Sequence, residues 1–443
     1  MLRRFAISGL LLWLAIPAGA RTRPHYGGTL RIETKGDPWQ LPDGVARRLV
    51  LDTLTTVDAG GAAEPALAIR WQSSDGAHRW EFVLRANVRF QDGTPLTADA
   101  VAASLDQACA ASRCPWRAVH AIGSAVVLVA DSPMPSLPDL LAQSEYAIAR
   151  QSATGGMVGT GPYRVTGFAD GALTLAANDD SWQGRPFADF IRILPHRSIR
   201  DQWLDLSVGN ADVVEVPAEM LRQAQQQRLN VMESGPVELL ALTIAPQGPL
   251  ANLEMRESIA LAVDRAALCN VIYQKQGEIT GSLLPESLSG YAFLFPTDRD
   301  LERARALRGG ATLPPLGLAA DDTGASTQLA SERLALNLHE AGFNVQIVSG
   351  GTAPLALRHV YLEAGSPRAA LNEMLAQLGQ NGTVSGTDAA AVWQAEQAAL
   401  ANETIVPLLW LPRAWAVGER VRDLRLSPDG MPLVANAALE GSQ

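Results

Sequence analysis

The residues from Arg79 to Leu105 read RWEFVLRANVRFQDGTPLTADAVAASL, and they say more about the fold than any other part of the chain. Apolar side chains occupy every second position from Trp80 to Leu84, which predicts a strand with one apolar face. Asp92 and Gly93 predict a turn, because glycine accepts a positive φ at little cost. Thr97 is a favourable N-cap for a helix that follows it. The stretch therefore predicts strand, turn and helix within an α/β domain.

The order of residues in and before this stretch resembles the signature of the family 5 solute-binding proteins, the peptide- and nickel-binding type that serves bacterial ABC importers. That signature reads approximately W-x-x-s-x-D-G-x-x-W-x-F-x-L-R-x-x-V-x-F-x-D-G-x-P-L-T-A-x-D-V. Its positions are occupied here by Trp71, Ser74, Asp75, Gly76, Trp80, Phe82, Leu84, Arg85, Val88, Phe90, Asp92, Gly93, Pro95, Leu96, Thr97, Ala98 and Val101. One position departs from the pattern, because Ala100 stands where the family carries an acid. In the family the signature is structural and contacts no ligand.

The resemblance continues in the same order from Tyr26 to about Leu439. Further markers are Gly27-Gly28, the string GTGPY at 159–163, and Asp264-Arg265 within a helical region predicted at 252–273. Such extended agreement in order is far more specific than a short motif.

The resemblance implies an α/β chain with the two-lobed periplasmic-binding-protein fold (type II, cluster C-like) and an extra domain inserted in the first lobe. Crossing strands would form the hinge between the lobes. The expected boundaries are a signal peptide at 1–20, first-lobe parts at 21–45 and 159–245, the inserted α/β domain at 46–158, the second lobe at 246–412, and a return to the first lobe at 413–443.

Length and charge agree with a protein of several domains that avoids polyanions. The chain has 443 residues, too many for one ordinary core, so two or three domains are expected. Its net charge of −10 makes nucleic acid and anionic lipid unexpected partners. We expect a monomer.

The N-terminus has the pattern of a secretory signal. Arg3 and Arg4 precede a short apolar run at 7–16, and Ala18-Gly19-Ala20 is an A-x-A cleavage site. A membrane anchor is the alternative, but the run is shorter than the roughly 20 residues that span a bilayer. The pattern predicts cleavage after Ala20 and release to the periplasm, and it leaves open whether export follows the general or the twin-arginine route.

Two of the three cysteines stand close together in the sequence. Cys109 and Cys114 could close a small disulfide loop in an oxidising compartment. Metal binding is the weaker alternative, because no second cysteine or histidine pair stands nearby. Cys269 is expected to be a buried core residue.

The sequence offers no positive sign of catalysis. Its six histidines include no pair at helical spacing, and no G-x-S-x-G elbow occurs. The glycine-rich loop at 155–163 lacks the Lys-Ser/Thr that a phosphate-binding loop carries. We therefore expect no enzyme, no catalytic residue, no metal site and no cofactor.

The resemblance also implies where a ligand would bind. In peptide-binding relatives a segment W-x-x-D-x-x-D-P supplies an acid for the peptide's amino group, and 359–367 matches it here. Ser366 stands where the acid before Pro367 is expected, and Glu363 is the carboxylate that remains. This difference puts capture of a free amino group in doubt. The candidate ligand residues are Trp39, Arg358, Tyr361, Glu363, Trp410 and Arg413.

The expected function is that of a periplasmic binding protein. It would capture a peptide-like or other small solute between two lobes and deliver it to an inner-membrane ABC permease with its ATPases. Two alternatives remain: a scaffold or sensor on the same fold that no longer serves transport, and a secreted enzyme that reuses the fold.

Overall fold

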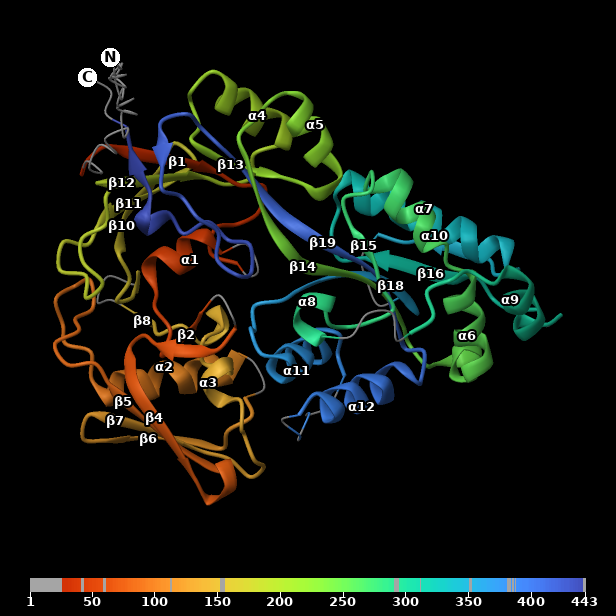
Figure 1. Cartoon of the computed structure of the whole chain (residues 1–443), viewed down its shortest axis with the longest axis horizontal. Coiled ribbons are helices and arrows are strands. Elements are labelled where there is room, and N and C mark those ends of the chain that lie inside the picture. Colours follow the sequence, from red (N-terminus) through yellow and green to blue (C-terminus); the bar gives the residue numbers. More distant parts are fainter. Residues whose placement is uncertain are drawn as a thin grey trace, which may run out of the picture.

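The computed structural model describes residues 26–440 except 41–43, 59–60, 112–113, 152–155, 291–294, 311, 350–352, 381–383, 385 and 387. The chain forms two α/β lobes and a smaller unit beside them (Figure 1). The predicted signal peptide lies outside the described residues. No helix in the described part is both long and apolar enough to traverse a lipid bilayer.

The first lobe is built on one end of a long mixed sheet. Its strands lie in the order β10 (Tyr163–Ala169), β11 (Ala172–Ala177), β12 (Phe190–Leu194), β1 (Thr29–Glu33) and β13 (Val213–Val216). β1 runs parallel to both β12 and β13. Alternate side chains reach opposite faces, so Val213 packs beside α1 (Val45–Val50). Val214 packs beside α4 (Ile199–Ser207) and α5 (Leu221–Gln226) on the other face.

Two long strands continue this sheet into the second lobe. They are β14 (Val231–Ile244) and β19 (Ile405–Val417), which pair with each other in both lobes. In the first lobe β19 also pairs with β13, and in the second lobe β14 also pairs with β18 (Leu355–Tyr361). The described residues thus form one 11-stranded sheet that crosses from lobe to lobe (Figure 1).

The pairing of β14 and β19 is irregular where the lobes meet. The register shifts on both sides of Pro236, and Pro236 lies opposite Pro412. Proline has no backbone N–H to donate, and register shifts of this kind bend a strand. The irregular pairing marks this junction as the hinge.

The second lobe covers its half of the sheet with helices on both faces. Beyond β18 lie β16 (Leu316–Ala320) and β17 (Val345–Ile347), while β15 (Glu278–Ile279) pairs with β19. One face packs against α6 (Leu253–Ala262), α9 (Leu301–Arg308) and α10 (Ala325–Glu340). The other face packs against α11 (Pro367–Gln377) and α12 (Ala389–Leu400).

The helical region predicted at 252–273 is interrupted. α6 ends at Ala262, Val263 is extended, and the Asp264 side chain accepts a hydrogen bond of 2.8 Å from Ala267 N to start α7 (Arg265–Ala267). A helical segment follows at Leu268–Ile272. The predicted helical region is confirmed, but it is divided into separate helices, because an aspartate in mid-pattern serves as the N-cap of a new helix.

The smaller unit, called the insert below, has its own sheet and core. Its strands lie in the order β4 (Ala68–Ser74), β5 (Arg79–Leu84), β7 (Ala125–Val129) and β6 (Ala118–Ile122), with α2 (Ala98–Ala111) against them. Trp80 and Phe82 are buried in this core, as the alternating pattern predicts. Thr97 Oγ1 accepts a hydrogen bond of 3.2 Å from Ala100 N. The predicted strand, turn and helix are confirmed, while the exact bounds of 46–158 stay a prediction.

Short elements complete the chain. They are β2 (Thr55–Val57), β3 (Ala63–Pro65), α3 (Leu137–Leu140), β8 (Arg150–Gln151), β9 (Met157–Val158), α8 (Glu286–Ser289), β20 (Val421–Arg422) and β21 (Ala438–Leu439). β20 and β21 pair with each other and pack on the first lobe, in the same core cluster as β1.

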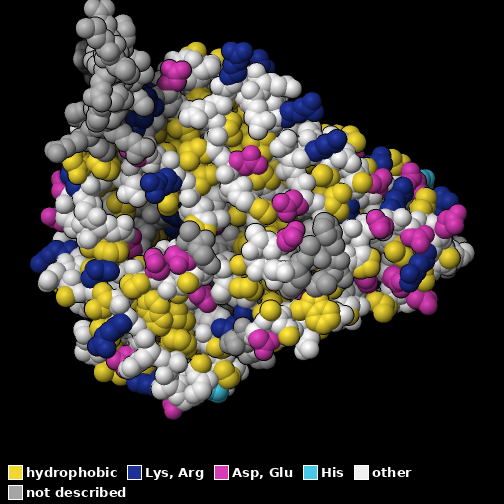
Figure 2. All heavy atoms as spheres, viewed as in Figure 1, with side chains coloured by type: hydrophobic (Ala, Val, Ile, Leu, Met, Phe, Trp, Pro, Cys, Tyr) yellow, Lys and Arg dark blue, Asp and Glu magenta, His cyan; other side chains and the backbone are white. Residues whose placement is uncertain are grey.

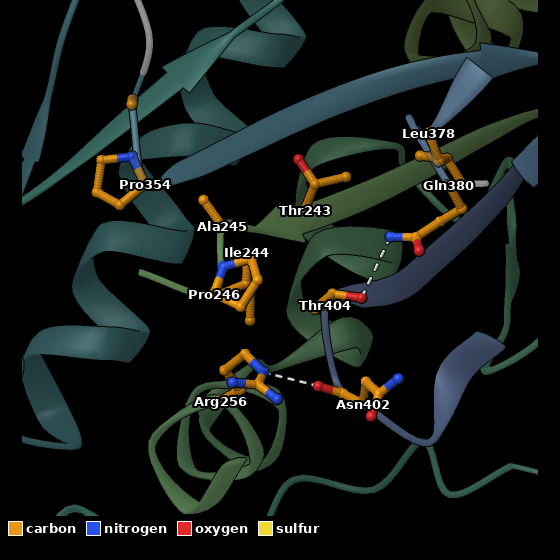
Figure 3. A pocket seen from close by; sticks show the side chains of 11 residues that line it. Thr243, Ile244, Ala245, Pro246, Arg256, Pro354, Leu378, Gln380, Asn402 and Thr404 are labelled. Carbon is orange, nitrogen blue, oxygen red and sulfur yellow. Dashed lines mark hydrogen bonds between the residues drawn. The ribbon is translucent and has the colours of Figure 1, made fainter. Parts of the chain in front are cut away.

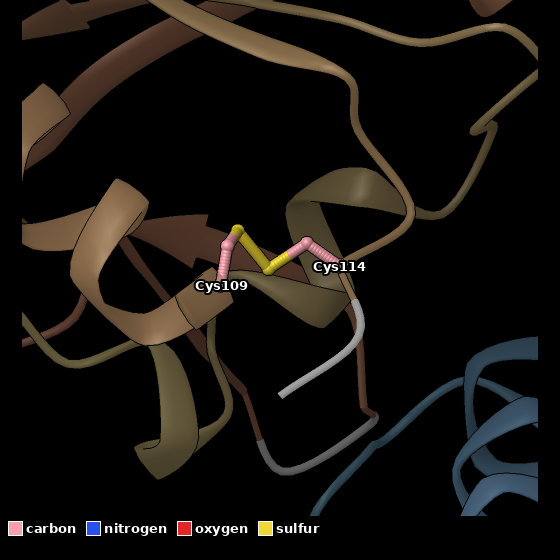
Figure 4. The surroundings of a disulfide bond; sticks show 2 residues. All are labelled: Cys109 and Cys114. Atoms are coloured by element: carbon pink, nitrogen blue, oxygen red, sulfur yellow. A yellow bond between two sulfur atoms is a disulfide. The ribbon is translucent and has the colours of Figure 1, made fainter. Parts of the chain in front are cut away.

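The predicted disulfide is present. Cys109, near the end of α2, is bonded to Cys114, with the two Cα atoms 5.1 Å apart (Figure 4). Cys269 is a free, buried thiol that contacts Gly277 O at 3.2 Å. The sequence left the pairing of Cys109 and Cys114 open, and the structure shows the bond, while the expectation that Cys269 is buried is confirmed.

Candidate ligand site between the lobes

The structure distributes the six predicted ligand residues over several surroundings. Trp39 is half-buried against the core of the first lobe, beside α1. Trp410 is 1% exposed and packs in the second-lobe core under α11 and α12. Arg358 lies on β18, where its Nε donates to Asp321 Oδ2 at 3.1 Å. Trp410 therefore contributes to packing, and we do not carry it into the proposed site.

Two of the predicted residues meet at the hinge. The guanidinium carbon of Arg413 lies 4.2 Å from the centre of the Tyr361 ring. The backbone N–H of Arg413 donates to Ser234 Oγ at 3.0 Å, beside the irregular pairing of the crossing strands. A cation over an aromatic face is attracted by the negative charge density of the ring. This contact joins β18 to β19 where the lobes bend.

Glu363 reaches from the second lobe to the first. Its Oε1 accepts a hydrogen bond of 3.1 Å from Arg48 Nη2 on α1. Its Oε2 accepts one of 2.8 Å from Ser144 N in the insert. Arg48 Nη2 also lies 2.5 Å from Asp429 Oδ2, in the C-terminal return to the first lobe. Glu363 thus contacts both the first lobe and the insert from the second lobe.

A second carboxylate, that of Glu373 on α11, binds the backbone of Glu363 and of the residue after it. It accepts backbone hydrogen bonds from Glu363 N at 3.2 Å and from Ala364 N at 2.9 Å. Burial raises the pKa of Glu373 well above its usual value, and the nearby Glu363 raises it further. We call Arg48, Glu363, Glu373 and Asp429 the interlobe charge cluster.

The arginine of this cluster stays charged. Burial lowers the pKa of Arg48, but Asp429 and Glu363 beside it outweigh that effect and leave the pKa raised. A guanidinium between two carboxylates keeps its proton because the opposite charges stabilise the ionised form.

Other contacts bring the lobes together on both sides of the cluster. Ser366 Oγ donates to Asp139 Oδ2 in the insert at 2.9 Å, and Arg368 Nε donates to Ser136 Oγ. Near the hinge Lys35 Nζ lies 3.1 Å from Asp322 Oδ1. The lobes are closed on each other in this structure.

The backbones of the two lobes also touch directly. A Cβ built on Gly365 would lie 2.2 Å from Gly61 Cα, between β2 and β3. Real Cβ atoms do not approach backbone so closely, so a larger residue at either position would separate the lobes. Glycine is needed here because the two chains pass so near each other.

The larger of two pockets, of about 440 Å³, lies within the second lobe alone (Figure 3). It is lined by Thr243, Ile244, Ala245, Pro246, Arg256, Ala353, Pro354, Leu378, Gln380, Asn402 and Thr404. Its polar groups largely bond one another: Arg256 Nε donates to Asn402 O at 2.7 Å, and Gln380 Nε2 donates to Thr404 Oγ1 at 3.3 Å. A ligand there would not connect the lobes.

The smaller pocket, of about 180 Å³, lies between the lobes. It is lined by Asp139 of α3 in the insert and by Ser289, Ser366, Pro367, Arg368, Ala389 and Val392 of the second lobe. Arg368 Nη1 is buried, and it finds no hydrogen-bond partner among the described residues. Burial raises the pKa of Asp139, although Ser366 donates to its carboxylate. The side chains of Asp139, Arg368 and two serines thus line this cavity.

The sequence pattern singled out Glu363 but not the residues that contact it or line the cavity. Arg48, Asp139 and Arg368 carry no motif, and each lies far along the chain from its partner. Arg368 directly follows the segment 359–367, and this position was the available signal. Across the described residues, no three His, Cys, Asp or Glu side chains gather in a way that could hold a metal ion.

On the face drawn in Figure 2, Lys and Arg side chains are scattered among Asp and Glu.

Two lobes, a hinge of crossing strands and a cavity between the lobes define a two-lobed binding protein. The family profile of the bacterial extracellular solute-binding proteins, family 5 Middle, matches residues 62–364. The chain belongs to this family, and the resemblance seen in its sequence is confirmed.

Individual relatives are identical to the chain at about a quarter of the aligned positions. The probable di/tripeptide-binding protein 5 of Pseudomonas aeruginosa is 24% identical over 357 residues, 68% of this chain and 67% of that protein. The probable D,D-dipeptide-binding periplasmic protein DdpA of Escherichia coli is 24% identical over 280 residues, 58% of this chain and 54% of that protein. The chain thus spans about half to two thirds of the length of these curated relatives.

Solved structures of the same fold match almost the whole chain. The murein tripeptide binding protein MppA of Escherichia coli has a TM-score of 0.81 at 15% identity, covering 94% of this chain and 99% of that one. NikA of Staphylococcus aureus, in complex with Ni(L-His)2, has a TM-score of 0.79 at 18% identity, covering 93% and 100%. These likenesses show the two-lobed fold.

Proposed function

We propose that this chain is a periplasmic solute-binding protein that captures a small solute between its lobes and delivers it to an inner-membrane ABC permease driven by partner ATPases. The observation that carries the proposal is the interlobe cavity, which is lined by Asp139 from one lobe and Arg368 from the other. A ligand that contacts both lobes stabilises the closed state by its differential affinity for that state. The closed monomer would then be the form that the permease recognises.

Two observations support the proposed periplasmic location. The first is the signal-like N-terminus, and the second is the Cys109–Cys114 disulfide. Disulfides persist in oxidising compartments such as the bacterial periplasm. Several relatives are also named as periplasmic binding proteins.

The proposed role is binding rather than catalysis. The relatives and the solved structures carry the names of binding proteins for peptides, nickel and heme. The cavity of about 180 Å³ is smaller than the roughly 300–1,000 Å³ of common ligand pockets. It therefore suits a solute of the size of an amino acid or a small acid better than a long peptide.

Native mass spectrometry of the chain purified from its host without refolding is the direct test. We expect one small solute to remain bound to the wild type and to be lost from the double variant Arg368→Met, Asp139→Asn. Arg303→Met is the matched control, because Arg303 is 59% exposed and pairs with Glu257 away from the cavity. A chain without bound solute, or equal retention in all three proteins, would contradict the proposal.

A second candidate is a sensor or scaffold on the same fold that no longer serves transport. The observation that favours it is the pairing of Glu363 with Arg48, which closes the lobes through the chain's own charges. Absence of bound solute together with a closed ligand-free chain would support this candidate over transport.

A further inference from the structure

We propose that Arg48 is the built-in counter-ion of Glu363 and a specificity-determining residue: it takes the place of a ligand's cationic group and restricts the interlobe site to small neutral or anionic solutes. The inference rests on the proposed function, because it names the class of solute for that site. It concerns a residue that no sequence pattern singles out.

Both oxygens of the Glu363 carboxylate already have partners. Oε1 binds Arg48 Nη2 at 3.1 Å, and Oε2 binds Ser144 N at 2.8 Å. The other two carboxylates are also engaged, since Asp429 contacts Arg48 and Ser427 Oγ while Glu373 accepts two backbone N–H groups. An incoming ammonium would have to displace one of these bonds.

The pair lies where the two lobes meet, in and beside the segment whose Ser366 and Pro367 line the interlobe cavity. Glu363 lies in the segment 359–367, two residues from Gly365, which touches the opposite lobe. Its side chain is 13% exposed and that of Asp429 is 8% exposed. Carboxylates this far from solvent need a positive partner, because an unpaired buried charge is costly. The chain supplies that partner itself.

An internal guanidinium competes strongly with a free amine. Arg48 is held on α1, so its effective concentration at Glu363 is set by the fold, at the millimolar level or above for tethered groups in general. Guanidinium is also less strongly hydrated than ammonium and matches carboxylate geometry better. A solute amine at micromolar concentration therefore does not replace it.

The donor that remains for a ligand is Arg368. Arg368 lines the interlobe cavity, and its Nη1 is buried without a hydrogen-bond partner in the described part of the chain. A carboxylate or carbonyl oxygen of the solute would satisfy this donor. The group available to the solute is thus the Arg368 guanidinium, while the Glu363 carboxylate remains paired with Arg48.

The first experiment measures closure without any ligand. Small-angle X-ray scattering of ligand-stripped wild type should show the compact, closed form, and Arg48→Met should shift the radius of gyration upward. Arg47→Met is the matched control, because Arg47 on the same helix donates to the backbone oxygens of Ser144 and Glu145. Glu363→Gln should open the lobes as Arg48→Met does, which keeps the test valid if one variant does not fold. An open wild type, or variants as compact as the wild type, overturns the proposal.

The second experiment measures specificity by calorimetry with defined probes. Dialanine amide carries an amine and no carboxylate, and N-acetyldialanine carries a carboxylate and no amine. We expect wild type to ignore dialanine amide, and Arg48→Met to bind it at least about tenfold more tightly, a change of roughly 1.4 kcal/mol. N-acetyldialanine should bind wild type no worse than it binds the variant. Amine-dependent binding to wild type, or no gain in Arg48→Met, overturns the specificity role.

These outcomes separate the inference from the proposed function. Closure in scattering depends on Arg48 and needs no solute, so it can succeed where native mass spectrometry finds nothing bound. Conversely, a retained solute that proves to be an amine paired with Glu363 would sustain transport and overturn the role of Arg48.

Discussion

Asp212 and Glu363 are both acids held by arginine, but one lies inside a lobe and the other between lobes. Asp212 is 2% exposed and binds Arg31 Nη2 at 3.0 Å and Arg420 Nη2 at 2.7 Å, all within the first lobe. Glu363 binds one arginine, Arg48, across the gap. A carboxylate–arginine pair thus stabilises the fold of one lobe at Asp212. At Glu363 the same kind of pair connects two lobes, so we expect it to break when the lobes move apart.

The surroundings of the two acids also differ in their hydrogen bonds and in their effect on carboxylate pKa values. Burial raises the pKa of Asp212, but hydrogen bonds from Arg420 and Arg31 outweigh it and leave the pKa below its usual value. Behind Glu363, burial leaves the pKa of Glu373 raised. The Asp212 carboxylate accepts five hydrogen bonds from Arg31 and Arg420, whereas the Glu363 carboxylate accepts one from Arg48 and one from Ser144 N, so we expect the Asp212 site to be the more rigid.

The largest expected effect comes from removing the acid inside the lobe. Asp212→Ala leaves Arg31 and Arg420 without their partner, and breaking such a buried pair should lower the free energy of unfolding by roughly 3–5 kcal/mol. Equilibrium unfolding in urea measures it. The control is Asp131→Ala, because Asp131 is 77% exposed in a surface pair with Arg117, and such pairs contribute about 0–1 kcal/mol. Equal losses of unfolding free energy in Asp212→Ala and Asp131→Ala would show that the buried pair stabilises the fold no more than the surface pair does.

A pH series tests a third acid on the strand that carries Arg31. Burial, and then the nearby Asp205, raises the pKa of Glu33 to about 7 against the opposing Arg197. The folded chain therefore holds a proton that the unfolded chain has released, and stability should fall as pH rises from about 4.5 through about 7. The full loss is up to roughly 3 kcal/mol, since one pKa unit corresponds to about 1.4 kcal/mol.

Glu33→Gln should remove this slope, as measured by urea unfolding between about pH 5 and about pH 8. Asp212, whose pKa is lowered, contributes its stability throughout that range and loses it only as pH falls below its usual value of 3.8. Asp212→Asn should therefore leave the slope unchanged. A slope that survives in Glu33→Gln would assign it to other groups.

The disulfide near the end of α2, in the insert, provides a smaller effect. Replacing Cys109 and Cys114 by serine should cost about 2 kcal/mol of unfolding free energy, because the loop that the bond closes is short. Scattering should still report closed lobes. Thiol counting on denatured, unreduced wild type should find one free thiol, Cys269, and three free thiols would rule the bond out.

The smallest expected effect on stability comes from Gly365→Ala, which tests lobe closure without changing a charged residue. Gly365→Ala places a Cβ 2.2 Å from Gly61 Cα, so it should hold the lobes apart while every charge stays in place. Gly167→Ala is the control, because a Cβ there meets nothing within 4 Å. Scattering should show an open Gly365→Ala chain whose urea unfolding lies within about 1 kcal/mol of wild type, as for most mild substitutions. A closed Gly365→Ala chain would mean that the backbone contact does not limit closure.

Local features were predictable from the sequence because their partners are close along the chain. The strand, turn and helix of 79–105 depend on alternation, on Gly93 and on the Thr97 cap, all within one short stretch. Cys109 and Cys114 are five residues apart. The long signature also identified the two-lobed fold before any contact was known.

Contacts between distant residues were not predictable. Arg48 and Glu363 are 315 residues apart, and they meet only because two lobes close. Trp410 sits in β19, where residues on both sides of the strand are buried, so no alternation reveals which face it takes. The pattern at 252–273 stayed helical through Asp264, whose role as a cap depends on Val263 being extended.

The hinge has a consequence for how this protein can be rebuilt. The chain enters the second lobe along β14 and leaves it along β19, and at the boundary Glu238 lies opposite Leu411. The second lobe is therefore an insertion whose two ends are neighbouring residues on adjacent antiparallel strands. Another family member's second lobe can be grafted at these two junctions without a linker. Such chimaeras would replace Glu363 and Arg368 as a unit while Arg48 stays in place, so the two halves of the site can be exchanged one at a time.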